Sequence, residues 1–304
     1  MTAQRARAMG IEASTTTALS IPSDIKARDV FALATAPHIQ SVAAEPANAA
    51  ATAAIRLIKL SRGVPAALVA KIADGGGDVL RSIAGVEISE VDWFFAHAAN
   101  TVTMTSDALI PLSSKTTARF VIFRDVLGLD QVAVIVGQPD FSAPVPVRLH
   151  SACLTGDVFG SRRCDCGDQL KLSLKRLEDL GGGVVLYLAQ EGRGIGLANK
   201  MRAYRLQDDG FDTHDANTML GFEDDERNYG IAAAMLAALN CTQIVLLTNN
   251  PAKMDGLTRA GVEVSSRIPL QAPVHSHNVR YLRTKALRSG HKLNGLTIPD
   301  ENDA

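Results

Sequence analysis

Hydrophobic and polar residues follow helical spacing in two stretches of the first third of the chain. AIRLIKLSRG (54–63) places its apolar residues on one helical face and ends at a glycine, and SEVDWFFAHAA (89–99) opens with Ser89 and Asp92 in capping-box order. Both stretches are predicted as helices, with Trp93 and Phe94 in the core. From 118 to 150 the pattern changes to three β-rich runs separated by Gly, Asp and Pro, which predicts a small antiparallel sheet.

Beyond residue 166 helical and strand patterns alternate. The predicted helix and strand pairs are 168–180 with 184–190, 228–240 with 242–248, and a short helix after Pro251 with 262–270. Repeated alternation of this kind is typical of a sheet with largely parallel strands. The sequence therefore predicts a mixed α/β (α+β) fold with a small β-rich entry region.

Polar clusters follow the predicted strands, where open α/β sheets place their ligands. They are QEGRGIGLANKMRAYRLQDDG (190–210), FEDDERNYG (222–230) and TNNPAKMDG (248–256). Each also has a plain structural interpretation: a strand-to-helix turn, an acid-rich helix start and an Asn-Pro turn, respectively. Taken singly, none of the three identifies a function.

The cysteines carry a stronger signal. Cys153, Cys164 and Cys166 are three of only four cysteines in the chain, and a disulfide framework would need an even set in a small secreted protein. Three clustered thiolates suit zinc, and a site with three protein ligands leaves a position for water or substrate. A fourth ligand from His150 or Asp157 would make the site structural instead, and three merely buried thiols are the other alternative. Cys241 is expected to be a small buried residue.

Composition narrows the classes of function. The 304 residues are 46% hydrophobic, enough for a sizeable core and an expected two domains. A net charge of −1 means that the chain has no overall positive charge to attract nucleic acid. An anionic ligand therefore has to be bound by basic residues within a local site. No apolar run approaches the about 20 residues of a membrane span, and no signal segment opens the chain. We expect a cytoplasmic protein with no membrane partner.

Read together, the motifs resemble a known family. Four motifs are similar, in this order, to GTP cyclohydrolase II, the zinc enzyme that opens the route from GTP to riboflavin. They are RLHSACLTGDVFGSRRCDCGDQL, YLAQEGRGIGLANKMRAYRLQDDGFDT, GFEDDERNYGIAAAML and LLTNNPAKMDGL. The resemblance implies a GTP cyclohydrolase II-like catalytic domain at 107–292. Residues 1–106 would be a partly helical N-terminal extension of unknown role, and 293–304 a C-terminal tail.

The resemblance also implies a site, residue by residue. Cys153, Cys164 and Cys166 match the zinc ligands. Asp225 matches a proton acceptor, Arg227 a proposed nucleophile and Tyr204 a site tyrosine. The positions that match GTP-binding residues are Arg148, Leu149, His150, Ser151, Ala152, Gln169, Glu191, Gly192, Arg193, Thr213, Thr248 and Lys253.

The implied reaction hydrolyses the guanine imidazole ring and releases formate and pyrophosphate, with Mg²⁺ on the triphosphate and a homodimer expected. Many members have Glu where this chain has Ala152, so a paralogue with another purine or pyrimidine substrate, or one that stops at the formylated intermediate, is the first alternative. A structural zinc module that binds nucleic acid is the second. No catalytic cluster precedes residue 140, so a chain beginning near Asp107 is expected to retain ring opening.

Overall fold

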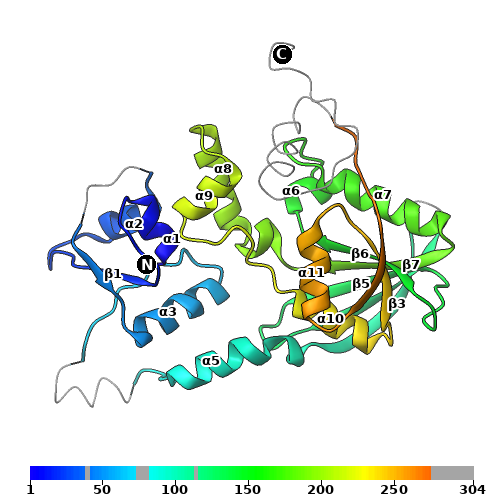
Figure 1. The fold of residues 1–304 in the computed structure, drawn as a ribbon, viewed down its shortest axis with the longest axis horizontal. Helices are drawn as coiled ribbons and strands as arrows, with labels where there is room; N and C mark the ends of the chain where they lie inside the picture. The colour runs from blue at the N-terminus through cyan, green and yellow to red at the C-terminus, as the bar shows by residue number, and fades with distance from the viewer. Residues whose placement is uncertain (38–41, 73–81, 113–115, 275–304) are drawn as a thin grey trace, which may run out of the picture. The chain divides into compact units, whose positions relative to one another are not determined.

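The computed structural model describes residues 1–37, 42–72, 82–112 and 116–274, and the expected tail at 293–304 lies outside them. The chain forms two compact units (Figure 1). The first unit joins Met1–His97 to Ile195–Glu226, and the second joins Ala98–Gly194 to the chain from Arg227 onward. Residues 195–226 therefore belong to the N-terminal unit, although the sequence places them between two strands of the other.

A seven-stranded sheet forms the centre of the second unit. Its strand order is β3-β4-β5-β7-β6-β8-β9. The strands are β3 (Thr103–Pro111), β4 (Thr117–Arg124), β5 (Asp130–Gly137), β6 (Val145–Ser151), β7 (Gly182–Leu188), β8 (Gln243–Leu247) and β9 (Glu263–Ile268). The first four in this order pair antiparallel, while β7, β6, β8 and β9 run parallel. The predicted mixed α/β fold is confirmed.

Strand β6 corrects the prediction of one antiparallel sheet over 118–150. The first two runs, β4 and β5, do pair antiparallel. The third run instead lies between β7 and β8 and is parallel to both. It is buried along most of its length, as a central parallel strand has to be, and a nearly continuous apolar run is the sequence signature of that position.

Helices cover both faces of this sheet (Figure 1). Val184, Leu186 and Leu188 of β7 join the core cluster under α10 (Tyr229–Ala238) and α11 (Pro251–Arg259), whereas Val185 joins the cluster under α7 (Cys166–Asp179). This split follows from the alternation of side chains along a strand. All the helices and strands predicted beyond residue 166 are present within a few residues of the expected bounds.

The first unit is mainly helical. Its elements are α1 (Ala3–Ala8), β1 (Thr17–Leu19), α2 (Ala27–Thr35), β2 (Ala44–Pro46), α3 (Ala49–Leu60), α5 (Ile88–His97), α8 (Leu197–Asp208) and α9 (Thr213–Met219). Arg5, 1% exposed, donates hydrogen bonds to the carbonyls of Leu33, Ala36 and Met219. Burial lowers the pKa of Arg5 to about 10, so the guanidinium stays charged and ties α1 to α2 and α9.

Helix α5 corrects one expectation about the core. Trp93 is 58% exposed and stacks on His97, one turn further on. The helix instead buries Val91, and a residue two positions later points about 200° away around the axis.

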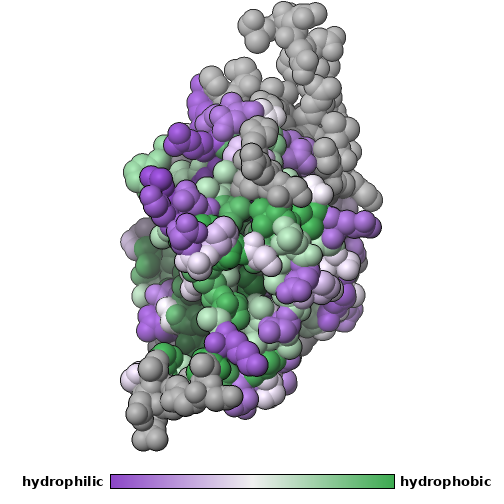
Figure 2. Space-filling model, turned by 90° about the vertical axis from the view of Figure 1, so that its left-hand side faces the viewer, coloured by the Kyte–Doolittle hydropathy of each residue, from purple (hydrophilic) through white to green (hydrophobic). Residues whose placement is uncertain are grey.

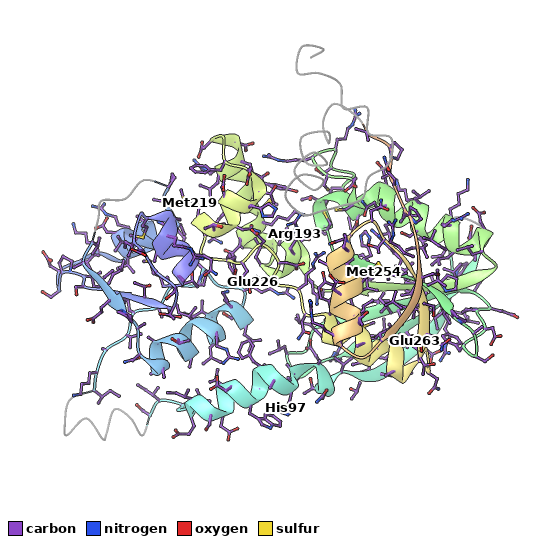
Figure 3. The ribbon with its side chains drawn as sticks, in the orientation of Figure 1. His97, Arg193, Met219, Glu226, Met254 and Glu263 are labelled. Atoms are coloured by element: carbon purple, nitrogen blue, oxygen red, sulfur yellow. The ribbon has the colours of Figure 1, made fainter. Side chains whose placement is uncertain are left out.

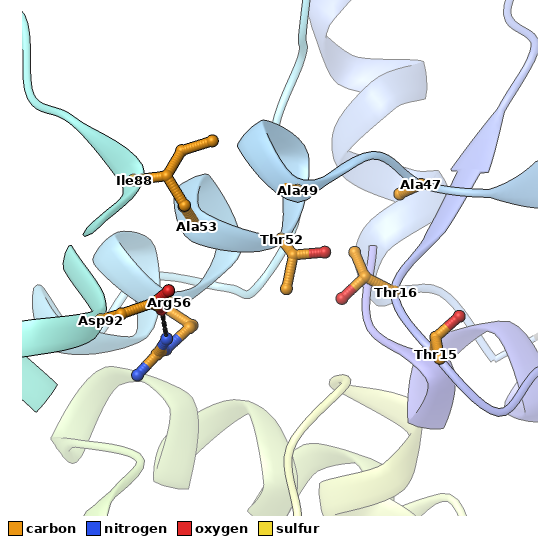
Figure 4. Close-up of a pocket in the computed structure, with 9 residues that line it drawn as sticks. All are labelled: Thr15, Thr16, Ala47, Ala49, Thr52, Ala53, Arg56, Ile88 and Asp92. Atoms are coloured by element: carbon orange, nitrogen blue, oxygen red, sulfur yellow. Dashed lines mark hydrogen bonds and ion pairs between the residues drawn. The ribbon is translucent and has the colours of Figure 1, made fainter. Parts of the chain in front are cut away.

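Helices α3 and α5 with residues 15–16 line an open pocket of about 510 Å³, in which Arg56 and Asp92 pair (Figure 4). Hydrophobic residues gather in the middle of the face drawn in Figure 2.

Candidate metal and anion site

The polar clusters of the second unit follow three adjacent parallel strands. Strand β6 ends at Ser151, β7 at Leu188 and β8 at Leu247, in the order β7-β6-β8. Their carboxyl ends therefore lie side by side, as the sequence analysis expected. Cys153 follows β6, Glu191 follows β7 and Thr248 follows β8.

The three clustered cysteines converge. Cys153 precedes the short helix α6 (Leu154–Asp157), and Cys166 opens α7. The three Sγ atoms lie within 4.8 Å of one another, and the Sγ atoms of Cys153 and Cys164 are 3.7 Å apart. A tetrahedral zinc ion with Zn–S bonds of about 2.3 Å separates its sulfur ligands by about 3.8 Å. The Cys153 and Cys164 thiols therefore have the spacing that zinc requires, and the third thiol lies close to both.

Close packing of thiols also favours a cation at this position. The neighbouring Cys153 thiol is the main cause that raises the pKa of Cys164, and partial burial adds to it. A divalent ion removes this resistance to ionisation because it neutralises the thiolates. Cys241 lies elsewhere in the core, 2% exposed, and burial raises its pKa to about 11, so the prediction of a small buried residue is confirmed.

His150 and Asp157, considered above as a fourth ligand, are paired with each other. His150 Nε2 lies 3.0 and 3.1 Å from the two Asp157 carboxylate oxygens, and both side chains are 3% exposed. Burial lowers the pKa of His150, and the Asp157 carboxylate acts against that shift. Within the part of the chain that the structure describes, the metal-ligand cluster consists of the three cysteines alone.

Buried cations lie at the same strand ends. Arg148, in β6, is 5% exposed and donates from Nη1 to the Leu247 carbonyl at 2.9 Å and from Nη2 to Gln169 Oε1 at 2.5 Å. Burial lowers the pKa of Arg148 to about 10, with nearby Arg227 adding to the effect, while Asp165 and Cys166 oppose it. Lys253 is 8% exposed and donates to the Leu149 carbonyl at 2.8 Å. Positive charge is therefore concentrated next to the thiols, where an anionic ligand would be stabilised.

The turn after β7 has an unusual backbone. Gly192 and Arg193 have φ angles of 65° and 61°, and Arg193, labelled in Figure 3, adopts this left-handed conformation without being glycine. Such a residue costs about 1–2 kcal/mol, a strain often found at functional sites. Glu191 is buried, and its Oε2 accepts the Leu154 N–H at 2.7 Å, which ties this turn to the cysteine-bearing turn.

The remaining sequence-predicted residues are distributed as follows. Leu149, His150 and Ser151 are the last residues of β6, and Ala152 follows them. Thr248 follows β8 and is 1% exposed. Tyr204 in α8, Thr213 at the start of α9 and Asp225 belong to the first unit. In that unit Lys200 Nζ lies 5.6 Å from the centroid of the Tyr204 ring, and Gln207 Nε2 donates a hydrogen bond to the Thr213 hydroxyl.

Three polar side chains in the site are not predicted as functional from the sequence. The sequence suggests Asp157 only as a metal ligand, and it places Tyr187, which donates to Asp157 Oδ2 at 2.9 Å, in an apolar strand. Gln190 donates to the Asn228 carbonyl at 2.8 Å, beside Arg227, and its Oε1 is buried without a hydrogen-bond partner. The one signal for Tyr187 is a polar hydroxyl within the otherwise aliphatic run VVLYL.

The fold and site together define a mixed α/β protein with a three-thiol cluster that could hold a metal ion, and with buried cations at the carboxyl ends of its parallel strands. A sequence profile of GTP cyclohydrolase II matches residues 104–269. A protein of Azospirillum brasilense named GTP cyclohydrolase-2 is 44% identical over 289 residues, which cover 90% of this chain and 75% of that protein. The chain belongs to the GTP cyclohydrolase II family and is an enzyme of its hydrolase type.

Two further relatives are longer than this chain. GTP cyclohydrolase-2 of Xylella fastidiosa strain 9a5c is 44% identical over 250 residues, which cover 82% of this chain and 63% of the relative. Riboflavin biosynthesis protein RibBA of Bacillus cereus strain ATCC 14579 is 42% identical over 253 residues, covering 80% and 64%. The chain thus spans just under two thirds of each of these two relatives.

Proposed function

We propose that this protein hydrolyses GTP, opening the guanine imidazole ring and releasing formate and pyrophosphate. The product is 2,5-diamino-6-(5-phosphoribosylamino)pyrimidin-4(3H)-one, and the step is the first of riboflavin biosynthesis. Family membership supports the reaction class. The observation that carries the proposal is the three-thiol cluster placed next to buried Arg148 and Lys253, because it combines a metal site with an anion site.

Zinc is the metal proposed for Cys153, Cys164 and Cys166, and the thiol spacing fits it. When bound, zinc supplies Lewis-acid activation of water at neutral pH, the chemistry that hydrolysis at guanine C8 needs. Asp157 and His150 hold each other and leave the three thiols as the protein ligands. Three ligands rather than four is the arrangement of a catalytic site.

The chain's own residues have separate proposed tasks. Arg148 and Lys253 neutralise the triphosphate, together with Mg²⁺, and Arg227 stabilises charge that develops at the α-phosphate. A guanidinium is protonated at ordinary pH, so charge stabilisation is a better physical role for Arg227 than covalent attack. Glu191 accepts hydrogen bonds from the guanine N1 and exocyclic amine, as a carboxylate can.

The remaining proposed roles rest on the resemblance. Asp225 accepts a proton, and Tyr204 contacts the reacting nucleotide. Leu149, Ser151, Ala152, Gln169, Gly192, Arg193, Thr213 and Thr248 complete the GTP-binding set, with His150. None of the described helices is long and apolar enough to cross a bilayer. A cytoplasmic homodimer, with residues 107–292 as the catalytic region and 1–106 as an extension, is part of the same proposal.

The alanine at position 152 favours one second candidate function. Its N–H bonds the Leu188 carbonyl at 2.8 Å, so the position adjoins both the thiol turn and the end of β7. A methyl group here, in place of the Glu of many relatives, removes one charge from the site. A paralogue that acts on another purine or pyrimidine, or that stops at the formylated intermediate, would use this difference.

Mass spectrometry of the product separates the two candidates. Purified protein with GTP, zinc and Mg²⁺ is expected to yield the deformylated diaminopyrimidinone 5′-phosphate. Accumulation of a formylated product, or no turnover of GTP alongside turnover of another nucleotide, would favour the paralogue. Ala152→Glu is the matched variant, since it restores the side chain of those relatives.

A further inference from the structure

One buried carboxylate in the second unit collects hydrogen bonds from three segments. Asp157 is the last residue of α6, and its two carboxylate oxygens lie 3.0 and 3.1 Å from His150 Nε2 of β6. Its Oδ2 also accepts a hydrogen bond from the Tyr187 hydroxyl of β7 at 2.9 Å. His150 and Tyr187 are register partners in the parallel ladder, and their rings stack with centroids 5.5 Å apart. The carboxylate is therefore anchored to two central strands of the sheet.

The same carboxylate holds the turn that carries the first thiol. Asp157 Oδ2 accepts the backbone N–H of Cys153 at 2.9 Å, and Glu191 Oε2 accepts the next N–H, that of Leu154, at 2.7 Å. Two consecutive peptide groups are thus each fixed by a buried carboxylate. Helix α6 has only four residues, too few to hold a conformation by itself, so these bonds decide where Cys153 lies.

We infer that Asp157 is a positioning residue of the thiol centre, which links the Cys153 turn to β6 and β7 and so sets the Cys153 Sγ at metal-binding distance from Cys164 and Cys166. The inference rests on the proposed function, since it takes the three thiols as a zinc site. A site ordered before the metal arrives binds it more tightly, because no ordering cost remains to be met on binding. Partners that orient metal ligands in this way typically contribute about 10–100-fold in metal affinity.

Zinc affinity of the full chain, measured by competition with a chromophoric chelator, tests the inference. Asp157→Asn, which keeps size and shape, is expected to bind zinc about 10–100-fold more weakly than the unmodified chain. Tyr187→Phe removes one hydrogen bond to Asp157 and is expected to weaken zinc about fivefold. Asp179→Asn makes the same chemical change at an exposed position of α7 and is expected to leave affinity unchanged.

A second measurement separates positioning from a general loss of stability. With Co²⁺ in place of zinc, Asp157→Asn is expected to shift the thiolate-to-metal absorption bands, because the Cys153 sulfur is displaced. Thermal unfolding of the metal-free chains is measured alongside. Weaker binding with an unchanged Co²⁺ spectrum and a lowered unfolding temperature would assign Asp157 a structural role only and overturn the inference.

Wild-type zinc affinity in Asp157→Asn would also overturn it. If that variant does not fold, Tyr187→Phe decides, and unchanged affinity in Tyr187→Phe contradicts the inference. Cys164→Ser is the reference for the proposed function. Zinc lost in Cys164→Ser but kept in Asp157→Asn refutes only the positioning role, whereas zinc kept at full affinity in Cys164→Ser refutes the metal site itself.

Discussion

Gly156 shows at the scale of single residues how the thiol centre is shaped. A Cβ atom added there would lie 3.0 Å from Cys164 Sγ and 3.1 Å from both Cys153 Sγ and Cys166 Cβ. These separations are shorter than ordinary van der Waals contacts. A side chain at this position would therefore press on the thiols, which would have to give by a few tenths of an ångström.

Gly156→Ala is accordingly expected to weaken zinc binding at least tenfold, because the sulfurs have to move by tenths of an ångström from tetrahedral spacing. Chelator competition measures the change. Gly85→Ala is the matched control, since a Cβ there meets nothing within 4 Å. Equal zinc affinity in both variants would contradict the proposed packing.

The cysteines themselves give a second prediction. Cys153→Ser, Cys164→Ser and Cys166→Ser are each expected to lose zinc and formate release, while Cys241→Ser keeps both, because Cys241 lies outside the thiol cluster. Elemental analysis of the purified variants decides between the outcomes. Full zinc stoichiometry in the three cluster variants would disprove the assignment of the ligands.

Residues differ in how far the sequence alone predicts their role. The cysteines could be predicted because their spacing along the chain is itself the signal. Asp157 and Tyr187 could not, since their contact depends on the register of β6 against β7, which places His150 beside Tyr187. Gln190 likewise meets Asn228 across 38 residues of chain, a contact that only the tertiary structure creates.

Among the elements, α11 places a cation at the site. Asn250 caps its N-terminus by accepting the Ala252 N–H at 3.0 Å, Pro251 follows in the first turn, and Lys253 donates to Leu149 from that turn. This local sequence is readable as a helix start. The position of Lys253 against β6 comes from the parallel pairing of β6 with β8.

Asn250→Ala is expected to lower the free energy of unfolding by about 1 kcal/mol and to raise KM for GTP more than it lowers kcat, because the helix start that holds Lys253 loses its cap. Asn250→Ser keeps a capping oxygen and is expected to retain most of both properties. Denaturant unfolding and steady-state assays measure them. A larger defect in Asn250→Ser than in Asn250→Ala would contradict the capping explanation.

For strand β6 and helix α5, the sequence predicts the element but not what it packs against. Both were predicted as elements, since propensity and periodicity are local properties. Strand β6 was given the wrong partners, because sheet order is decided by contacts between segments far apart in sequence. The sequence predicts Trp93 in the core, yet the face of α5 that packs is the one that carries Val91.

At the scale of the whole molecule, residues 195–226 fold with the N-terminal segment. Thr2 donates to the Gly221 carbonyl, Arg5 to that of Met219, and Asn199 to that of Arg62. A long insertion that packs on a distant segment leaves no periodic trace in the sequence. This is why the boundary expected near residue 106 did not anticipate the discontinuous unit.

The structure consequently changes the expectation for a chain that begins near Asp107. Removing residues 1–106 exposes the faces of α8 and α9 that pack on them, so residues 195–226, with Tyr204, Thr213 and Asp225, are expected to become protease-sensitive and formate release to fall strongly. Limited proteolysis and the formate assay test this. A truncated chain with protected α8 and α9 and full activity would show that the extension is dispensable.

Formate and pyrophosphate, measured in parallel from GTP with zinc and Mg²⁺, test the central claim most directly. The full chain is expected to release both products. Cys164→Ser is expected to release no formate while retaining some pyrophosphate release, because cleavage at the phosphate depends on Arg227, Lys253 and Mg²⁺ rather than on the thiol centre. No formate from the zinc-loaded full chain, or formate from Cys164→Ser at the unmodified rate, would contradict the account.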